Sequence, residues 1–363
     1  MNRPTQALLA LLQAGINNTT PHCDAPFPLT ADEWNEVLTL AQHQTVSGYA
    51  FAGVERLPDH LMPPDHIIMH WVAKVENIEQ TNQRITSAQA SLLQFFKDNH
   101  LHPIVQKGLG VARHYHQPQL RESGDIDLYF APSEWQAATQ AIKARGLNPE
   151  SRPDRSWIYL WNGIEVEHHP TLLDLSNPLH SKYCKALIDG QPTQQISDVT
   201  GTMTVPSPLI ELLLINAHIM KHAFGVGIGL RQICDYAAAC QNLHSKYSAN
   251  DYATACRKFG ISRWTALLHT FCTTYLGTDP NALPPSGCKH VNTNISPNTL
   301  FEIIIQGGNF GQYHAKGKRT YSTALSRKIH TAGTYLRRLN FSLRLAPAEA
   351  ICTALQLATG QHI

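Results

Sequence analysis

The sequence lacks long apolar runs, paired cysteines and a strong charge of either sign. Its most apolar stretch, 209–220, is too short to span a bilayer and contains Glu211 and Asn216. The eight cysteines form no C-x-x-C pair, which indicates no zinc site and predicts reduced, mostly buried thiols. The 29 basic and 27 acidic residues leave a net charge of +2, which requires no particular partner. Because no cleavable signal pattern follows Met1, we expect a cytoplasmic protein.

Two aspartates two residues apart are the most informative feature that is present. They lie in the run 123–130, Ser-Gly-Asp-Ile-Asp-Leu-Tyr-Phe, which is rich in β-forming residues. Side chains alternate along a strand, so Asp125 and Asp127 point one way while Ile126 and Leu128 point into the core. Adjacent carboxylates repel unless a cation lies between them, and Mg²⁺ or Mn²⁺ is the natural one. Taken alone, the pair is more typical of an exposed strand edge.

A second alternating run downstream offers a third carboxylate. Asn162-Gly163 separates two β-rich segments and predicts a hairpin. After this turn, Glu165, Glu167 and His169 share one strand face. If this strand lies beside the aspartate strand, Glu167 completes a three-carboxylate cluster of the kind that holds metal ions at a phosphoryl centre. We expect Glu165 to lie on a solvated face.

Upstream, residues 102–115 predict a short buried strand, a glycine turn and a helix. Glycine at the turn lets backbone N–H groups approach an anion, and a helix N-terminus adds favourable partial charge. Lys107, directly before Gly108, can supply a point charge to a phosphate. Strand–glycine–helix turns are common without ligands, so this signal depends on the acid cluster.

In this order, the segments resemble the nucleotidyltransferase superfamily with the DNA-polymerase-β-like fold, and more closely the uncharacterised bacterial nucleotidyltransferase family proteins. The central pattern is K-G…R-x-x-G-D-I-D-L…E-x-H, and the resemblance covers most of the chain. Further segments that carry it are Trp34, 44–46, 167–171, 177–178, His218-x-x-x-His222, 227–235 and 308–311.

The resemblance implies roles for these positions. It makes Asp125, Asp127 and Glu167 the metal ligands and the Lys107–Gly108 turn the phosphate-binding element. The superfamily usually has Gly-Ser in that turn, whereas Leu109 follows Gly108 here. The residues we expect at the nucleotide are therefore Lys107, Gly108, Arg121, Ser123, Gly124 and Arg231. His169 is a candidate proton shuttle or positioning residue.

Several residues have two interpretations. Arg231 either forms a helical ion pair with Asp235, four residues on, or reaches the nucleotide or acceptor. His218 and His222 share a helix face and either pack between helices or line the cleft. No acid occurs in 303–347, against eight basic residues, which predicts a solvated basic face, an electrostatic funnel or contact with an anionic membrane. Nucleic acid is not favoured, because no recognised binding motif accompanies the charge.

The sequence predicts an α+β fold with three regions. Residues 1–100 form a helical N-terminal region, 101–200 a nucleotidyltransferase-like mixed-sheet core and 201–363 a helical C-terminal region. Helices are expected from a capping box at Thr30 to about Gln44, over 64–99 with Ile68, Val72, Val75, Ile78 and Ile85 on one face, over 133–146, and from 206 onward.

We therefore expect a Mg²⁺- or Mn²⁺-dependent enzyme that transfers a nucleotidyl group from an NTP to an unknown acceptor, a small molecule or a protein. The first alternative is a non-catalytic nucleotide-sensing or partner-binding module on the same fold, favoured by Leu109. The second is a metal-dependent phosphohydrolase that uses water as the acceptor.

Overall fold

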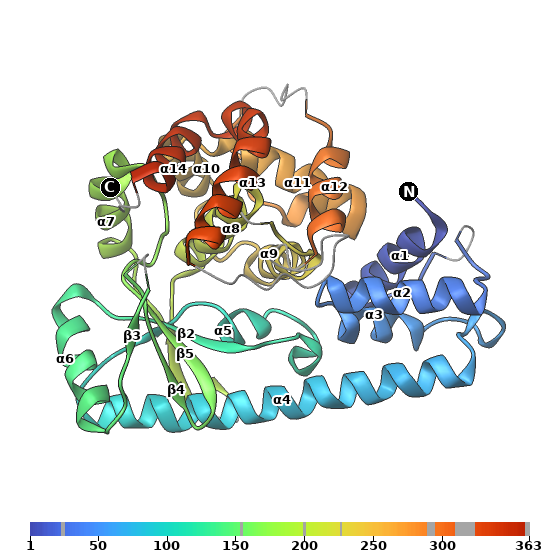
Figure 1. The fold of residues 1–363 in the computed structure, drawn as a ribbon, viewed down its shortest axis with the longest axis horizontal. Coiled ribbons are helices and arrows are strands. Elements are labelled where there is room, and N and C mark those ends of the chain that lie inside the picture. Colours follow the sequence, from blue (N-terminus) through green and yellow to red (C-terminus); the bar gives the residue numbers. More distant parts are fainter. Residues whose placement is uncertain are drawn as a thin grey trace.

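A seven-stranded mixed sheet lies between one long helix and the C-terminal helices (Figure 1). The computed structural model describes residues 1–22, 26–152, 155–198, 201–225, 227–288, 295–308 and 324–359. No helix in these ranges is long and apolar enough to cross a membrane. The mixed sheet flanked by helices confirms the predicted fold class.

The N-terminal region consists of helices, as predicted. Its elements are α1 (Arg3–Asn17), α2 (Ala31–His43), α3 (Ser47–Val54) and α4 (Asp65–Asp98). Thr30 caps α2, and its side chain and that of Glu33 form the reciprocal capping box. Helix α4 passes beneath the N-terminal helices at one end and the sheet at the other (Figure 1).

The buried face of α4 differs from the predicted one at its start. Val75, Ile78 and Ile85 are buried, but Ile67 and Trp71 take the positions expected for Ile68 and Val72. The indole of Trp71 donates a hydrogen bond to the carbonyl of Ser47 at 3.0 Å, which fixes this end of α4 against α3. The face changes because the helix packs on different partners at its two ends.

The sheet has the strand order β3-β4-β5-β2-β1-β7-β6. The strands are β1 (Ile104–Val105), β2 (Asp125–Tyr129), β3 (Glu150–Ser151), β4 (Trp157–Trp161), β5 (Ile164–His169), β6 (Gln194–Asp198) and β7 (Gly201–Val205). Strand β2 runs parallel to β5 and antiparallel to β1, which pairs in parallel with β7. The hairpin at Asn162-Gly163 is confirmed, and both residues have the positive φ that its turn requires. The sheet ends at Val205, past the predicted end of the core.

One face of the sheet is covered and the other faces the site. Ile126, Leu128 and Val166 pack with Phe96 of α4 and Ile142 of α6 (Pro132–Ala144). Strand alternation therefore directs the acidic residues of β2 and β5 toward the opposite face, on the side of the C-terminal helices (Figure 1).

Helices make up most of the described part of the chain after the sheet. Short α5 (Leu109–Ala112) and α7 (Ser181–Asp189) lie within the core region. The C-terminal helices are α8 (Pro208–Phe224), α9 (Leu230–Leu243), α10 (Ala249–Lys258), α11 (Ser262–Leu276), α12 (Pro297–Gly307), α13 (Ala324–Leu345) and α14 (Pro347–Thr359). Ser207 caps α8 through the backbone N–H of Ile210, as expected of the Pro-Ser-Pro sequence before it.

A buried polar network joins four of these helices. Asn216 on α8 donates to the hydroxyl of Tyr252 at 2.9 Å and accepts from the indole of Trp264 at 2.8 Å. The Tyr236 hydroxyl lies 2.8 Å from the Tyr252 hydroxyl and 2.8 Å from Nε2 of His269. Burial lowers the pKa of His269 to about 3.

This pKa makes stability depend on pH. The unfolded chain protonates His269 near pH 6.5, whereas the folded chain keeps it neutral down to about 3. The neutral, buried imidazole therefore contributes fully to the free energy of unfolding above about pH 6.5. This contribution is lost as the pH falls, at up to ~1.4 kcal/mol per pH unit. We expect His269→Gln to flatten the pH dependence of urea unfolding between pH 7 and 5 by roughly 2 kcal/mol relative to the wild type. Identical slopes for the two proteins would contradict this assignment.

Candidate functional site

The parallel pairing of β2 and β5 brings the predicted acids together. Asp125 lies opposite Glu165 and Asp127 opposite Glu167 in the register of the two strands. These side chains share the face that α4 and α6 do not cover. The predicted neighbouring strands are therefore present, with Glu167 directly beside Asp127.

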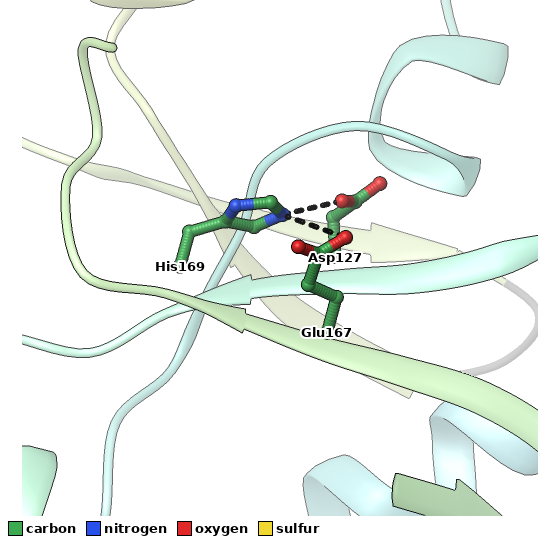
Figure 2. Close-up of side chains that lie close together, drawn as sticks. All are labelled: Asp127, Glu167 and His169. Carbon is green, nitrogen blue, oxygen red and sulfur yellow. Dashed lines mark hydrogen bonds and ion pairs between the residues drawn. The ribbon is translucent and has the colours of Figure 1, made fainter. Parts of the chain in front are cut away.

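The side chains of Asp127, Glu167 and His169 form one donor cluster (Figure 2). One ligand atom from each lies within 4.8 Å of the others. Nε2 of His169 is 2.6 Å from Oδ1 of Asp127 and 3.8 Å from Oε2 of Glu167. Asp125 shares the strand face but is not part of this group. The sequence predicted His169 on this face as a proton shuttle or positioning residue, not as a cluster member equal to the acids.

The two aspartates differ in their protonation. Repulsion from Asp127, together with burial, raises the pKa of Asp125 to about 6. Burial also opposes ionisation of Asp127, but the Lys107 ammonium and the hydrogen bond from His169 outweigh it and hold the pKa of Asp127 well below its usual range. Asp127 is therefore the permanently charged member of the pair.

Lys107 lies at the cluster and not apart from it. Its Nζ is 3.1 Å from Oδ1 of Asp127 and 3.4 Å from Nε2 of His169. The turn that carries it has the predicted order of strand, glycine and helix, and Gly108 has a positive φ of 53°. A Cβ at Gly108 would lie 3.1 Å from the carbonyl oxygen of Asp125, so the turn approaches β2 closely. Because α5 has only four residues, its contribution to anion binding is small.

A buried ion pair connects the start of β2 to α9. Nε and Nη2 of Arg121 donate to the two carboxylate oxygens of Asp235, both at 2.7 Å. The Tyr115 hydroxyl donates to the same carboxylate at 2.8 Å, and Nη1 of Arg121 donates to the hydroxyl of Ser123 at 3.0 Å. Arg121 thus holds the Ser123-Gly124 segment that precedes the aspartates, and Asp235 is the partner that the sequence did not assign to it.

This pairing bears on the helical ion pair predicted for Arg231. Asp235 is bound by Arg121, so the predicted helical ion pair between Arg231 and Asp235 is not formed. Arg231 instead lines the pocket at the acids, where Nη1 donates to the carbonyl of Glu122. Its Nε is buried and has no hydrogen-bond partner among the described residues. Burial and the neighbouring Arg121 lower the pKa of Arg231.

Gln44 anchors the helix that carries Arg231. Its Oε1 accepts from the backbone N–H of Leu230 at 3.0 Å, and its Nε2 donates to the carbonyl of Ile304 at 3.1 Å. Its own carbonyl accepts from the N–H of Arg231 at 3.4 Å. The resemblance included Gln44 without a role, and the structure shows that it positions the N-terminus of α9.

The acids, Lys107 and Arg231 line a pocket of about 320 Å³. Its other wall is formed by α8 and is mainly apolar, with Leu214, Ile215 and Ile219. His218 and His222 lie in this wall, with ring centroids 4.4 Å apart, so the cleft-lining interpretation is correct. Burial lowers the pKa of His222 to about 3 and that of His218 well below its usual value. Both rings are neutral at pH 7.

Arg152 borders the pocket beside Glu165 and Glu167. Its guanidinium is 3.1 Å from Glu165 and 3.7 Å from Glu167. The Glu165 side chain is 44% exposed, against 12% for Glu167. Glu165 therefore lies on the solvated part of the face, as expected.

The basic C-terminal stretch is only partly described. Lys316, Lys318 and Arg319 lie outside the described residues, as do the predicted residues 309–311. Arg337 is exposed, but Nη1 of Arg338 donates to the carbonyls of Ala223 and Gly225, at 3.2 and 3.0 Å. Arg338 thus caps the end of α8. A solvated basic face in 303–347 would therefore consist of basic residues other than Arg338.

The described cysteines are all free thiols. Cys234, Cys240, Cys256 and Cys272 are buried, while Cys184, Cys288 and Cys352 are partly exposed. Cys23 lies outside the described residues. The prediction of unpaired, mostly buried thiols holds for this part of the chain.

Comparison with known protein families shows the family of the chain. A family model described as uncharacterised nucleotidyltransferase matches residues 30–277, which is most of the chain. The chain therefore belongs to this nucleotidyltransferase family. A crystal structure of an antigenic nucleotidyltransferase-like protein from Paracoccidioides brasiliensis matches at 11% identity and a TM-score of 0.33, over 54% of this chain and 94% of that one. At these values the likeness carries no argument. No curated protein matches the chain.

The Arg121–Asp235 pair generates a stability prediction with an internal control. Asp235→Ala leaves the Arg121 guanidinium buried without its partner, so we expect a loss of roughly 3–5 kcal/mol in the free energy of unfolding. Glu165→Ala removes an exposed partner of Arg152 and should cost less than about 1 kcal/mol. Urea unfolding followed by circular dichroism measures both, and similar losses for the two variants would contradict the prediction.

Proposed function

We propose that the protein transfers a nucleotidyl group from an NTP to an acceptor hydroxyl or phosphate at this pocket, with Asp125, Asp127 and Glu167 as the acids that hold a divalent ion. The observation that carries the proposal is the register of β2 and β5, which places Asp127 beside Glu167 in the wall of a pocket that also contains Lys107 and Arg231. Membership of the nucleotidyltransferase family supports a nucleotide as substrate.

The donor chemistry fits Mg²⁺ or Mn²⁺. Carboxylate oxygens are the ligands that both ions accept, and Asp127 is charged throughout the physiological pH range because of Lys107 and His169. A divalent ion bound here would neutralise phosphate charge and orient the phosphates for in-line displacement.

Lys107 and Arg231 are the cations placed to contact the phosphates. Lys107 reaches the cluster from the Gly108 turn, where backbone N–H groups can approach an anion closely. Arg231 carries a buried Nε without a described partner, and a phosphate oxygen would satisfy it. Nε and Nη2 of Arg121 already donate to Asp235 and Nη1 donates to Ser123, so its role is to position Ser123 and Gly124.

Glu167 is the candidate proton acceptor for the incoming hydroxyl. Asp127 is already contacted by Lys107 and His169, whereas Glu167 meets Arg152 at 3.7 Å and His169 at 3.8 Å. Catalysis at such a site rests mainly on positioning and charge neutralisation, with proton transfer contributing about 10²–10⁴-fold.

The apolar wall of α8 suits the uncharged part of a substrate. Leu214, Ile215 and Ile219 offer contacts to a base or to an acceptor body, away from the phosphates. His218 and His222 are neutral, so they can exchange hydrogen bonds with polar groups but do not add positive charge for phosphate binding. The pocket is thus divided into a charged half, formed by the sheet, the Lys107 turn and α9, and a largely apolar half on α8.

The proposal predicts a metal-dependent thermal shift with nucleotide. At about 100 times the dissociation constant an NTP adds ~2.7 kcal/mol to stability, which raises Tm by a few degrees. We expect this shift for the wild type with Mg²⁺ or Mn²⁺ and not with chelator. Asp127→Asn should lose this thermal shift, because the variant removes the charged carboxylate that lies beside Glu167 and Lys107 and is proposed to hold the ion. Differential scanning fluorimetry with each of the four NTPs measures the shift and shows the preferred base.

Glu165→Gln is the matched control, since it neutralises a glutamate on the same strand face outside the donor cluster. It should keep the shift, and an equal loss in both variants would refute the assignment of the acids. Incubation with α-labelled NTP then separates the alternatives. Label on an acceptor supports transfer, free nucleoside monophosphate indicates the phosphohydrolase, and binding without pyrophosphate release indicates the nucleotide sensor favoured by Leu109.

A further inference from the structure

We propose that His169 is a direct metal ligand beside Asp127 and Glu167, and that this imidazole makes the site bind Mn²⁺ more tightly than Mg²⁺. The inference rests on the proposed function for the presence of a divalent ion, and goes beyond it in assigning a nitrogen ligand and an ion preference. The evidence for this ligand is the set of donor atoms that lie close together. The cluster whose atoms lie within 4.8 Å of one another contains His169, whereas Asp125 is not part of it.

The spacing of the donor atoms fits a shared ion. In an octahedral site with metal–ligand distances near 2.1 Å, adjacent donors are about 3 Å apart. Nε2 of His169 lies 2.6 Å from Oδ1 of Asp127 and 3.8 Å from Oε2 of Glu167, which brackets this value. Figure 2 shows the imidazole edge directed at both carboxylates. Small side-chain rotations would bring the three atoms around one centre.

The backbone explains why His169 and not its neighbour has this role. Successive side chains on β5 point to opposite faces, so His168 enters the core and its Nε2 lies 2.8 Å from the Tyr159 hydroxyl. His169 is on the face of Glu167, two residues earlier. The pattern Glu-x-His on a strand therefore places a carboxylate and an imidazole side by side, next to Asp127 on the parallel strand.

The site already holds a cation in the absence of metal. Nζ of Lys107 lies 3.1 Å from Asp127 and 3.4 Å from Nε2 of His169, at the donor atoms a metal would use. A divalent ion that binds these donor atoms must displace the Lys107 ammonium from them. Lys107 is then free to contact a phosphate, which connects ion binding to the proposed role of the turn.

The donor set favours a transition ion. Mg²⁺ prefers oxygen ligands in near-ideal octahedral geometry, whereas imidazole is a ligand typical of first-row transition metals. Mn²⁺ accepts carboxylates as Mg²⁺ does and lies within the series that binds imidazole, so a site in which one imidazole nitrogen joins the carboxylates suits it better than Mg²⁺. Replacing the nitrogen should reduce this preference, by roughly tenfold or more, since even residues outside the ligand shell change metal affinity 10–100-fold.

Electron paramagnetic resonance tests the inference without an activity assay. Mn²⁺ is titrated into the full-length protein, free Mn²⁺ is followed by its six-line signal, and Mg²⁺ is added in competition. Pulsed measurements on the bound ion detect a coordinated ¹⁴N nucleus. We expect the nitrogen signal and tighter binding of Mn²⁺ in the wild type. His169→Gln should lose the signal and most of the preference, and His169→Asp should shift the preference toward Mg²⁺.

His218→Gln is the matched control, because it makes the same change at a histidine that lines the pocket but lies outside the donor cluster, and it should retain the nitrogen signal. The inference is overturned if wild-type protein binds no Mn²⁺, if bound Mn²⁺ shows no nitrogen coupling, or if the coupling persists in His169→Gln. Nucleotide binding is scored separately by the thermal shift with Mg²⁺. A retained shift without nitrogen coupling rejects the inference alone, whereas nitrogen coupling without any nucleotide shift rejects the proposed function alone.

Discussion

The parallel pairing of β2 with β5 is the constraint on which the site depends. These strands are far apart in the sequence, yet their register sets Asp127 opposite Glu167 and leaves His169 on the same face. Because strand side chains alternate with a period of two, a slip of one residue would turn the acids into the core against α4. The apolar partners Ile126, Leu128 and Val166 prevent that slip, since each is almost fully buried. Core packing on one face thus fixes the chemistry on the other.

The pocket is lined by residues of the core and C-terminal regions, and the N-terminal region holds the helix that carries Arg231. The buried contact of Arg121 with Asp235 ties the segment before β2 to α9, and Gln44 from the N-terminal region holds the start of the same helix. The carbonyl of Glu122 accepts a hydrogen bond from Arg231. The carboxylate of Glu122 accepts one from the backbone N–H of Ser47 at 2.9 Å. The C-terminal helices are therefore part of the pocket wall, whereas the N-terminal region supports it, and the family match from residue 30 to 277 spans both.

The sequence was most informative where local periodicity carries the signal. The capping box at Thr30, the hairpin at Asn162-Gly163 and the alternation around Asp125 and Asp127 are short-range patterns, and the structure has each of them. Long-range choices were less predictable. The sequence left two partners open for Arg231, and the helical one is wrong because Arg121 takes Asp235. The apolar stripe of α4 is shifted at its start because Trp71 packs against α3.

By itself, the sequence determined which side chains share a face, because alternation along a strand and spacing along a helix are properties of neighbouring residues. It therefore predicted the acid face, while the resemblance of its motifs to a known family indicated the role of the Lys107–Gly108 turn and the family. The tertiary structure alone decided what meets that face: the Lys107 ammonium on Asp127, the imidazole of His169 in the donor cluster, and the neutral histidines of α8 across the pocket. Such contacts depend on how distant elements pack and on how burial shifts protonation, and neither is encoded in the spacing of residues along the chain.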